Sequence, residues 1–403
     1  MKGQNWHKFP ILFSLYIAQS IPMSFFSTVV PVIMRQENYS LESIGLLQLV
    51  KLPWILKFLW APLIDKKANN SNDLKRWIIG SELFYAVIIF TIGFLSLQTD
   101  FQMIVILMII AFTASATQDI ATDAFAVLIL KKNERSLGNS VQSAGSFIGS
   151  LMGTGVLLIA YHYFGWQALL WILAGFVIFV VGPLPYFKKK SPVPKAEAKS
   201  ISPAASIQFF TRKGMWKRLL LLLTYYSGII GILAMLKPYM VDLGYTVKEI
   251  GFMSGIFGTA VAAGSAFLGG AIQKRIGRRT ALKSFAILNL LVTLYFIAIS
   301  INQPNIYQIY TGIALLWGTY GFSSVIIYTT SMDIVRKGYE GTDFTVQIVI
   351  SHLSGVIFAV LSGKLAGALG YTGLFASEAG FALLAILIVF FILHKNNDYA
   401  NIE

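Results

Sequence analysis

The heptapeptide YSLESIG, residues 39–45, recurs 206 residues later as YTVKEIG, residues 245–251. The chain has 403 residues, so this offset is close to half of its length. Both copies place Ser or Thr just before an apolar run, where these residues commonly cap a helix. Thr246 and Glu249 also have the spacing of a capping box. The repeat therefore indicates two related halves that run in the same orientation.

The composition is that of a membrane protein. Hydrophobic residues make up 56% of the chain and charged residues only 12%, whereas a soluble domain carries about 25% charged residues. Cysteine is absent from the sequence, which excludes a disulfide framework and a thiolate metal site. The first apolar run, from Phe9 past Met34, is too long for a signal peptide, so we expect a retained first span.

Twelve apolar segments are long enough to cross a bilayer as helices, which takes about 20 residues each. A segment rich in Lys, Pro and Ser begins at Lys188 and divides six spans from six. The sequence therefore predicts an all-α membrane protein of two six-helix bundles, residues 1–187 and 217–403, joined by a cytoplasmic linker, residues 188–216. The predicted spans are 9–34, 43–64, 77–97, 102–130, 137–161, 165–187, 217–241, 247–272, 280–301, 306–335, 343–369 and 374–394.

The basic residues predict the orientation of these spans. Most of the 32 Lys and Arg residues fall in segments on one side of the predicted membrane, and only Arg35 and Lys248 fall on the other. This asymmetry follows the positive-inside rule and predicts that both termini are cytoplasmic. The net charge of +14 is thus explained by topology, and we expect no nucleic-acid partner. Four lysines remain within spans: Lys51, Lys57, Lys237 and Lys364.

Two basic loops follow equivalent spans in the halves, APLIDKK from Ala61 and GGAIQKRIGRR from Gly269. They resemble the signature that the major facilitator superfamily carries between spans 2 and 3. Asp65 could pair with bases or with a helix N-terminus of the other half and hold one conformation closed. The alternative is plain anchoring by positive charge. The candidate gate residues are Asp65, Lys66, Arg275, Arg278 and Arg279.

A closer resemblance lies in KLPWILKFLWAPLID, residues 51–65, and QDIATDAFAVLIL, residues 118–130. Together they resemble the AmpG-like branch of the major facilitator superfamily, which includes muropeptide permeases and acetyl-coenzyme A transporters. The resemblance implies proton-driven import of an anhydromuropeptide or similar solute across the bacterial inner membrane by alternating access between two bundles. Span 5 does not clearly keep the branch's Gly-Tyr-Arg pattern, so an importer or exporter of another sugar, peptide or organic anion remains the alternative.

Asp119 and Asp123 are the most unusual residues of the apolar spans. Their i,i+4 spacing puts both on one helix face, about 18 Å and 12 Å inward from Lys131 at 1.5 Å per residue. A charged group at the bilayer centre costs about 2.5–3.5 kcal/mol on insertion scales. The presence of each acid in this span therefore requires a structural or functional explanation. Lys57 lies at a similar depth and could neutralise one acid, leaving the other to titrate. The alternative is a purely structural salt bridge.

We therefore expect a proton-coupling or substrate site built from Asp119, Asp123, Lys57, Lys51 and Gln118. Lys51 is expected either to bind an anionic group of the substrate or to pair with Asp119. Weaker candidates for the cavity wall could instead be structural or lipid-facing; they are Tyr16, Gln19, Trp54, Tyr225, Tyr226, Lys237, Trp317, Tyr320, Gln347 and His352. Asp333 is expected to pair with Arg336 or Lys337 or to cap a helix, and Lys364 to pair with Glu378.

The sequence offers nothing for an enzyme. It contains no G-x-x-x-x-G-K-[ST] phosphate loop, so transport should be driven by an ion gradient. The four histidines have no H-E-x-x-H spacing. We expect no enzymatic activity, no cofactor and no metal. The expected partners are a small-molecule substrate, a proton and the lipid bilayer, with a monomer as the functional unit.

Overall fold

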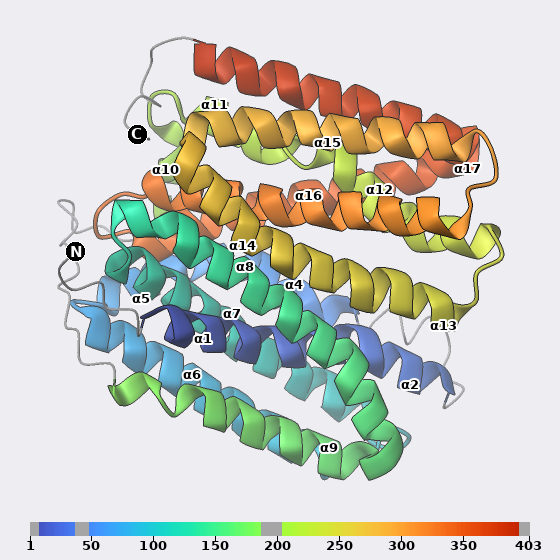
Figure 1. Cartoon of the computed structure of the whole chain (residues 1–403). Helices are drawn as coiled ribbons and strands as arrows, with labels where there is room; N and C mark the ends of the chain where they lie inside the picture. The colour runs from blue at the N-terminus through green and yellow to red at the C-terminus, as the bar shows by residue number, and fades with distance from the viewer. Residues whose placement is uncertain (1–7, 37–47, 187–203, 395–403) are drawn as a thin grey trace. The chain divides into compact units, whose positions relative to one another are not determined.

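The computed structural model describes residues 8–36, 48–186 and 204–394 (Figure 1), and these residues contain helices but no β-strand. The first copy of the sequence repeat lies outside the described residues. In the first part of the chain the helices are α1 Lys8–Ser24, α2 Val30–Gln36, α4 Leu52–Leu56, α5 Ala61–Lys67, α6 Ser71–Ile92, α7 Phe101–Ile129, α8 Arg135–Leu151 and α9 Leu157–Val181. The later helices are α10 Ala204–Thr211, α11 Met215–Thr224, α12 Ser227–Asp242, α13 Val247–Ile250, α14 Thr259–Ile276, α15 Arg278–Ser300, α16 Ile306–Asp333 and α17 Glu340–His394.

Within the described part of the chain, seven helical segments are long and apolar enough to cross a membrane. Predicted spans 1, 2, 3 and 5 are not among them, and the helices of spans 1 and 2 are interrupted. A π-helical segment, η1 Phe25–Val29, separates α1 from α2, and two 3₁₀ segments, η2 Gln48–Lys51 and η3 Lys57–Leu59, flank α4. The total of twelve spans therefore stays a prediction. The seven segments are Phe101–Ile129, Ala160–Tyr186, Met215–Asp242, Lys248–Ile276, Arg278–Ser300, Ile306–Asp333 and Glu340–Leu393.

Two glycines at equivalent positions of the two halves have the same backbone conformation. Gly165 interrupts α9 with φ 71° and ψ −177°, and Gly370 interrupts α17 with φ 69° and ψ −179°. Positive φ is strained for residues with a side chain, so glycine is the residue that turns the chain here. The two positions are 205 residues apart, nearly the offset of the sequence repeat. Each glycine lies at the predicted junction of two spans, the fifth with the sixth and the eleventh with the twelfth.

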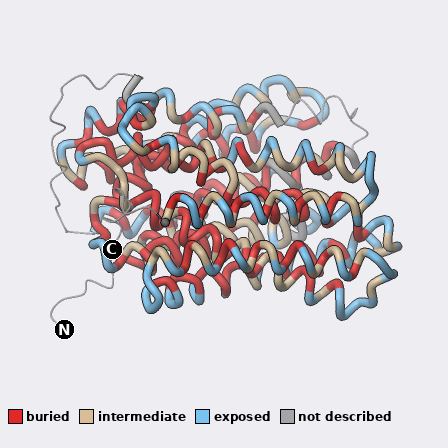
Figure 2. The backbone as a smooth tube through the Cα atoms, turned by 90° about the horizontal axis from the view of Figure 1, so that it is seen from above, coloured by how far each residue is buried: buried red, intermediate tan, exposed pale blue. Residues whose placement is uncertain are grey.

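The chain divides into two compact units. The first unit contains Met1–Lys131, Gly145–Ser206 and Val335–Val346, and the second contains Lys132–Ala144, Ile207–Ile334 and Gln347–Glu403. Each unit has its own apolar core, and Figure 2 shows buried and exposed positions alternating around the turns of the helices. The start of α8 thus packs with the second unit, and the start of α17 packs with the first. Domain borders at residues 187 and 217 remain a prediction.

A stripe of glycines brings the later part of α8 close to α1 in the first unit. A Cβ added at Gly145 would lie 3.3 Å from the Tyr16 Cβ, and one at Gly149 would lie 2.8 Å from the Ser20 Cβ. At Gly153, in the π-helical segment that follows α8, the added atom would lie 2.3 Å from a backbone oxygen of α1. Small residues permit such close helix approach. This packing helps to fix the register of α1, which carries Tyr16 and Gln19.

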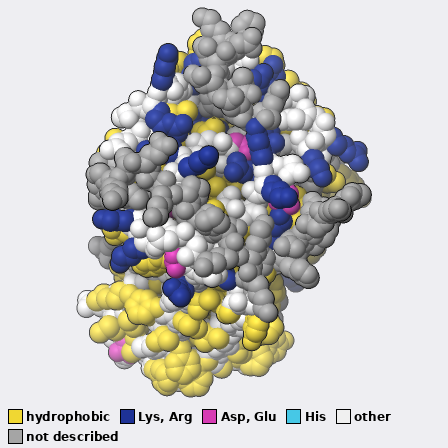
Figure 3. All heavy atoms as spheres, turned by 90° about the vertical axis from the view of Figure 1, so that its left-hand side faces the viewer, with side chains coloured by type: hydrophobic (Ala, Val, Ile, Leu, Met, Phe, Trp, Pro, Cys, Tyr) yellow, Lys and Arg dark blue, Asp and Glu magenta, His cyan; other side chains and the backbone are white. Residues whose placement is uncertain are grey.

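On the face of the molecule seen in Figure 3, Lys and Arg side chains are numerous and Asp and Glu side chains are few. Such a concentration of basic groups is what the positive-inside rule leads one to expect of a cytoplasmic face. The cytoplasmic location of the termini stays a prediction.

Candidate functional site

A buried polar network in the first unit surrounds Asp119 on α7. Gln19 on α1 donates from Nε2 to Asp119 Oδ1 over 2.5 Å, and Lys57 forms an ion pair with Asp119 Oδ2. The Lys57 ammonium also lies 4.7 Å from the centre of the Trp54 ring. All four side chains are buried. Each carboxylate oxygen of Asp119 therefore has its own donor, one of them charged.

Asp123 lies one helical turn further along α7 and has a different partner. Tyr16 on α1 donates its hydroxyl to Asp123 Oδ1 over 2.7 Å, and both residues are buried. A phenol can donate to a carboxylate and can accept from a carboxylic acid. Asp119 thus contacts a lysine and an amide, and among the contacts of Asp123 is a phenol, which suits either protonation state of the acid.

Several polar atoms on the helices that build this network are buried without a hydrogen-bond partner among the described residues. They are Gln19 Oε1, Trp54 Nε1, Ser115 Oγ and Gln118 Oε1. Gln118 Nε2 donates to Thr122 Oγ1, one turn along its own helix, over 2.9 Å. Because buried polar groups normally find partners, these atoms could bind water or cargo.

Lys51 does not belong to the ion pair. It is half-buried at the end of η2 and makes no hydrogen bond or ion pair with the residues that the structure describes. The expected alternative in which Lys51 pairs with Asp119 is wrong, because Lys57 takes that position. Binding of an anionic substrate group by Lys51 stays a prediction.

The second unit holds a cavity of about 370 Å³ between α12, α16 and the first part of α17. Three predicted residues, Tyr226, Tyr320 and His352, line it, and the rings of Tyr226 and Tyr320 lie 5.7 Å apart. Tyr328 and Ser351 also line the cavity and were not predicted. A mostly apolar wall with a few polar groups is typical of a small-molecule site.

Four other predicted residues do not line this cavity. Tyr225 points into the core and donates to the carbonyl of Leu282 over 3.0 Å. The ring of Trp317 fills the space left by Gly258, where an added Cβ would lie 2.4 Å from it. Packing and hydrogen bonding thus commit both aromatic side chains elsewhere. The remaining two are Gln347, which is buried against Arg218, and Lys237, which is exposed.

Arg218 on α11 is a fully buried cation that was not predicted to be a site residue. Its guanidinium donates to Gln347 Oε1 over 2.8 Å, to Thr330 Oγ1 over 3.1 Å and to Ser331 Oγ over 2.5 Å. It therefore ties α11 to α16 and α17 inside the second unit. Its place at the start of an apolar run made it look like a cytoplasmic anchor. The polar residues Thr330, Ser331 and Gln347 at a similar depth in two later spans were the available signal.

Asp65 contacts a helix N-terminus within the first unit, one of the two kinds of partner that we expected. Its carboxylate accepts from Gly341 N over 3.0 Å, from Thr342 N over 2.7 Å and from Thr342 Oγ1 over 2.6 Å. The first turn of α17 thus meets a negative charge, which the helix dipole favours. Burial raises the pKa of Asp65 to about 7, with a smaller rise from Glu340, although these hydrogen bonds oppose the rise. Its gating role stays a prediction.

Asp333 at the end of α16 has partners other than the expected ones. It accepts from Arg135 over 2.8 Å and forms an ion pair with Arg278, both within the second unit. Arg336 instead makes a two-pronged pair with Asp343, with NH2 lying 2.6 Å from Oδ1. The expected pairing of Asp333 with Arg336 is therefore wrong, because Arg336 lies beyond the helix end and turns toward α17.

The other gate candidates are less engaged than Asp65 and Arg278. Lys66 and Arg275 are exposed, and neither makes a hydrogen bond or ion pair with described residues. Arg279 is half-buried, and its Nε has no hydrogen-bond partner in the described chain. The full or partial exposure of these three residues and their lack of partners in the described chain favour topological anchoring by positive charge over a role in a conformational gate.

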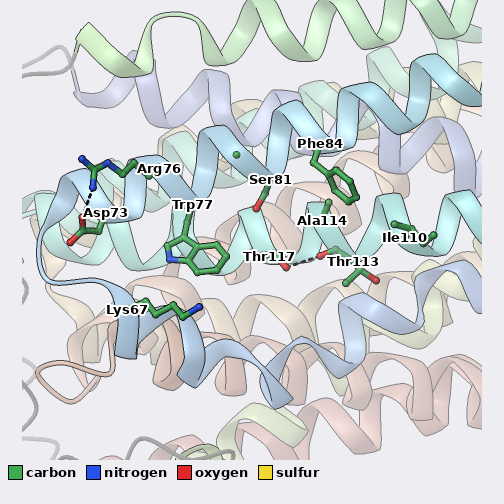
Figure 4. Close-up of a pocket in the computed structure, with 11 residues that line it drawn as sticks. Lys67, Asp73, Arg76, Trp77, Ser81, Phe84, Ile110, Thr113, Ala114 and Thr117 are labelled. Atoms are coloured by element: carbon green, nitrogen blue, oxygen red, sulfur yellow. Dashed lines mark hydrogen bonds and ion pairs between the residues drawn. The ribbon is translucent and has the colours of Figure 1, made fainter.

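A groove of about 690 Å³ lies in the first unit, formed by α6, α7 and the end of α5. Figure 4 shows Lys67, Asp73 and Arg76 at one end and Phe84 and Ile110 toward the other. Phe84 is 53% exposed and Ile110 39% exposed, so the groove opens on the outer surface of the helices. No residue of the buried acid network lines it, and we do not assign it to cargo.

The sequence matches the model of the Major Facilitator Superfamily over residues 12–359. It is 26% identical over 401 residues to an anhydromuropeptide permease of Escherichia coli strain K12, covering 98% of this chain and 81% of the relative. It is also 26% identical over 415 residues to a putative transporter, AmpG 3, of Rickettsia typhi, covering 97% and 96%. A solved major facilitator transporter, FucP, in the outward conformation has a TM-score of 0.73 at 15% identity, covering 96% of this chain and 98% of that chain.

Proposed function

This chain belongs to the Major Facilitator Superfamily, and we propose that it imports a muropeptide or a similar cell-wall-derived solute by proton-coupled secondary transport. It is a multi-pass protein of the inner membrane. The proposed topology has twelve spans and cytoplasmic termini. Alternating access between the two units would expose the cargo site to one side of the membrane at a time.

The observation that carries the proposal is the pair of buried acids on α7, Asp119 and Asp123, each in contact with a polar side chain of another helix. Asp119 is matched by Lys57, so its charge is neutralised inside the unit. Asp123 contacts the hydroxyl of Tyr16, which can stay in contact with the acid before and after a proton is bound. We assign proton binding to Asp123 and a fixed, charge-matched role to Asp119. Two acids one turn apart on a helix also favour protonation of one of them.

The cargo assignment rests on relatives and on the chemistry of the cavity walls. An anhydromuropeptide permease is among the relatives over nearly the whole chain. Muropeptides combine sugar rings with an acidic peptide, and the tyrosines at 226, 320 and 328 offer aromatic faces to the sugar. Separately from that cavity, Lys51 of the first unit is exposed in part and has no protein partner among the described residues, which suits a contact with an anionic group.

Uptake by the purified protein in liposomes tests this function. Labelled anhydromuropeptide, a free sugar, a peptide and an organic anion would each be offered with and without an inward proton gradient. We expect anhydromuropeptide to accumulate only with the gradient. Accumulation of another solute instead would replace the cargo, and a rate that ignores the gradient would remove proton coupling.

A further inference from the structure

Glu378, on the part of α17 that follows Gly370, is an acid buried inside the second unit with 0% exposure. The neighbouring helix, α12, has a glycine, Gly231, where it contacts Glu378. A Cβ added at Gly231 would lie 1.9 Å from Glu378 Oε1 and 2.1 Å from Ser362 Oγ. A Cβ added at Gly228 would lie 2.9 Å from the Glu378 carbonyl oxygen. The carboxyl group therefore occupies a space that only glycine at position 231 leaves open.

No charged partner neutralises Glu378 among the described residues. The expected ion pair with Lys364 is wrong, because Lys364 is exposed and Glu378 Oε1 contacts Ser362 instead. Lys237 and Asp242, two charged residues toward the C-terminal end of α12, are also exposed. Gly231 and Ser362, the groups that meet the carboxyl from α12 and from the first part of α17, carry no charge. An ionised carboxylate would be costly in such surroundings.

The hydrogen bonds of Ser362 indicate how this cost is avoided. Ser362 Oγ lies 2.6 Å from the carbonyl oxygen of Phe358 and 2.5 Å from Glu378 Oε1. A hydroxyl has one proton to donate, and a carbonyl oxygen can only accept. If Ser362 donates to Phe358, the second short contact is a hydrogen bond only when Glu378 supplies the proton. Two bonds at once thus require Glu378 in the acid form.

The same geometry also permits Glu378 to release its proton. When Glu378 is ionised, the Ser362 hydroxyl can rotate and donate to Oε1 without moving a heavy atom, because the Phe358 carbonyl already belongs to a helix. Glu378 Oε2 then carries charge with no hydrogen-bond partner among the described residues. The ionised state is therefore allowed by geometry but of higher free energy. A site with two such states can bind and release a proton.

The two residues that contact this carboxyl group have sequence neighbours in the wall of the second unit's cavity. Ala359 and Ile230 line the 370 Å³ cavity. Ser362 follows Ala359 by three residues on the same helix, which places both on one face, and Gly231 is the next residue after Ile230. The cavity therefore offers a route for a proton released from Glu378.

We propose that Glu378, with Ser362, is a second proton-binding site of this protein, separate from the acids of α7. Binding forms the O–H bond of Glu378 with a proton taken from water, and release returns that proton to water, so the site changes by one proton and one charge. Its use in the transport cycle rests on the function proposed above. Its protonation does not depend on which cargo is carried.

Infrared spectroscopy of the full-length protein in liposomes, without cargo, tests the protonation directly. At neutral pH we expect a carbonyl stretching band of a buried carboxylic acid that disappears in Glu378→Gln. Glu249→Gln is the control, because the exposed Glu249 accepts hydrogen bonds from Thr246 and should not contribute to that band. Ser362→Ala retains the acid and should shift the band to higher frequency, which provides a test if Glu378→Gln fails to fold. An unchanged band in both Glu378→Gln and Ser362→Ala would overturn the proposal.

Transport by the same variant tests the use of the proton. Glu378→Gln mimics the acid form but cannot release a proton. We expect it to exchange labelled for unlabelled cargo across the membrane and to lose proton-driven accumulation by at least tenfold. Accumulation equal to wild type would show that Glu378 is a permanently neutral structural group and would overturn the second site. Failure of anhydromuropeptide to move in wild type would count against the proposed cargo, while the infrared result would still stand.

Discussion

Lys57 and Asp119 are 62 residues apart in the sequence and form an ion pair in which both side chains are buried, 1% and 6% exposed. Lys57 comes from the broken second span and Asp119 from α7, so the pair joins two neighbouring elements of the first unit. Removing one partner leaves a buried charge unmatched, which costs about 3–5 kcal/mol. We expect Lys57→Met and Asp119→Asn each to lower the free energy of unfolding by that amount, measured by denaturation in detergent.

The double variant Lys57→Met/Asp119→Asn should recover a large part of this loss because no unmatched charge remains. Arg76→Gln is the control, since Arg76 is 83% exposed in its pair with Asp73, and such pairs contribute about 0–1 kcal/mol. Losses that simply add in the double variant would contradict a direct pairing.

The contact of Asp65 with the start of α17 should depend on pH. Its pKa rises from 3.8 to about 7 on folding because burial outweighs the hydrogen bonds from Gly341 and Thr342. The folded state therefore binds the proton more tightly than the unfolded state. The stability contributed by Asp65 is full below about pH 4 and is lost as the pH rises through about 7.

Thermal unfolding of wild type and Asp65→Asn across this range measures the effect. The wild-type midpoint should fall with rising pH between about 4 and 7 more steeply than the midpoint of Asp65→Asn, which has no carboxyl to titrate. Parallel curves for the two proteins would mean that Asp65 keeps its ordinary pKa in the folded state.

Uptake should be sensitive to the volume of the cavity in the second unit. Ala359→Leu adds three carbon atoms to the wall of a 370 Å³ cavity. Cargo that fits the cavity would be displaced, and we expect kcat/KM for uptake to fall at least tenfold, a change of about 1.4 kcal/mol. Gly80→Leu is the matched control. Gly80 lines the outer groove, and nothing lies within 4 Å of an added Cβ. A loss of uptake in Gly80→Leu with normal uptake in Ala359→Leu would move the cargo site to the groove.

Replacing Arg218 with lysine should destabilise the protein. The planar guanidinium donates to Gln347, Thr330 and Ser331 at once, and an ammonium group cannot reproduce that fork. Each buried acceptor left without a donor costs about 1–3 kcal/mol. We expect Arg218→Lys to lower the unfolding midpoint markedly, whereas Arg212→Lys at an exposed position should leave it unchanged. Equal midpoints would show that the fork contributes nothing to stability.

Charged residues within an apolar run could be identified as unusual from the sequence alone. Asp119, Asp123 and Lys57 were identified because charges are costly in a membrane, and the structure brings Lys57 and Asp119 together. Spacing alone left open whether Lys57 or Lys51 pairs with Asp119. That choice depends on the broken helix of span 2, where two 3₁₀ segments change the direction of successive side chains.

Residues whose role depends on tertiary packing were harder to predict. Arg218 looked like an anchor at the membrane surface because its partners come from spans more than 100 residues away. Glu82 in α6 was overlooked although it is buried, with one carboxyl oxygen without a partner in the described chain. Glu378 was assigned the wrong partner because Lys364 is close in sequence but exposed. The space at Gly231 that admits the carboxyl group is visible only in three dimensions.

Proton coupling through the acids of α7 is tested most directly by the transport of Asp123→Asn in liposomes. Accumulation of labelled cargo under an inward proton gradient would be compared with exchange of labelled for unlabelled cargo in the same preparation. We predict that Asp123→Asn retains exchange, because the cavity of the second unit is intact, and loses gradient-driven accumulation, because Tyr16 then faces an amide that cannot titrate. Gradient-driven accumulation at the wild-type level would contradict proton binding at Asp123.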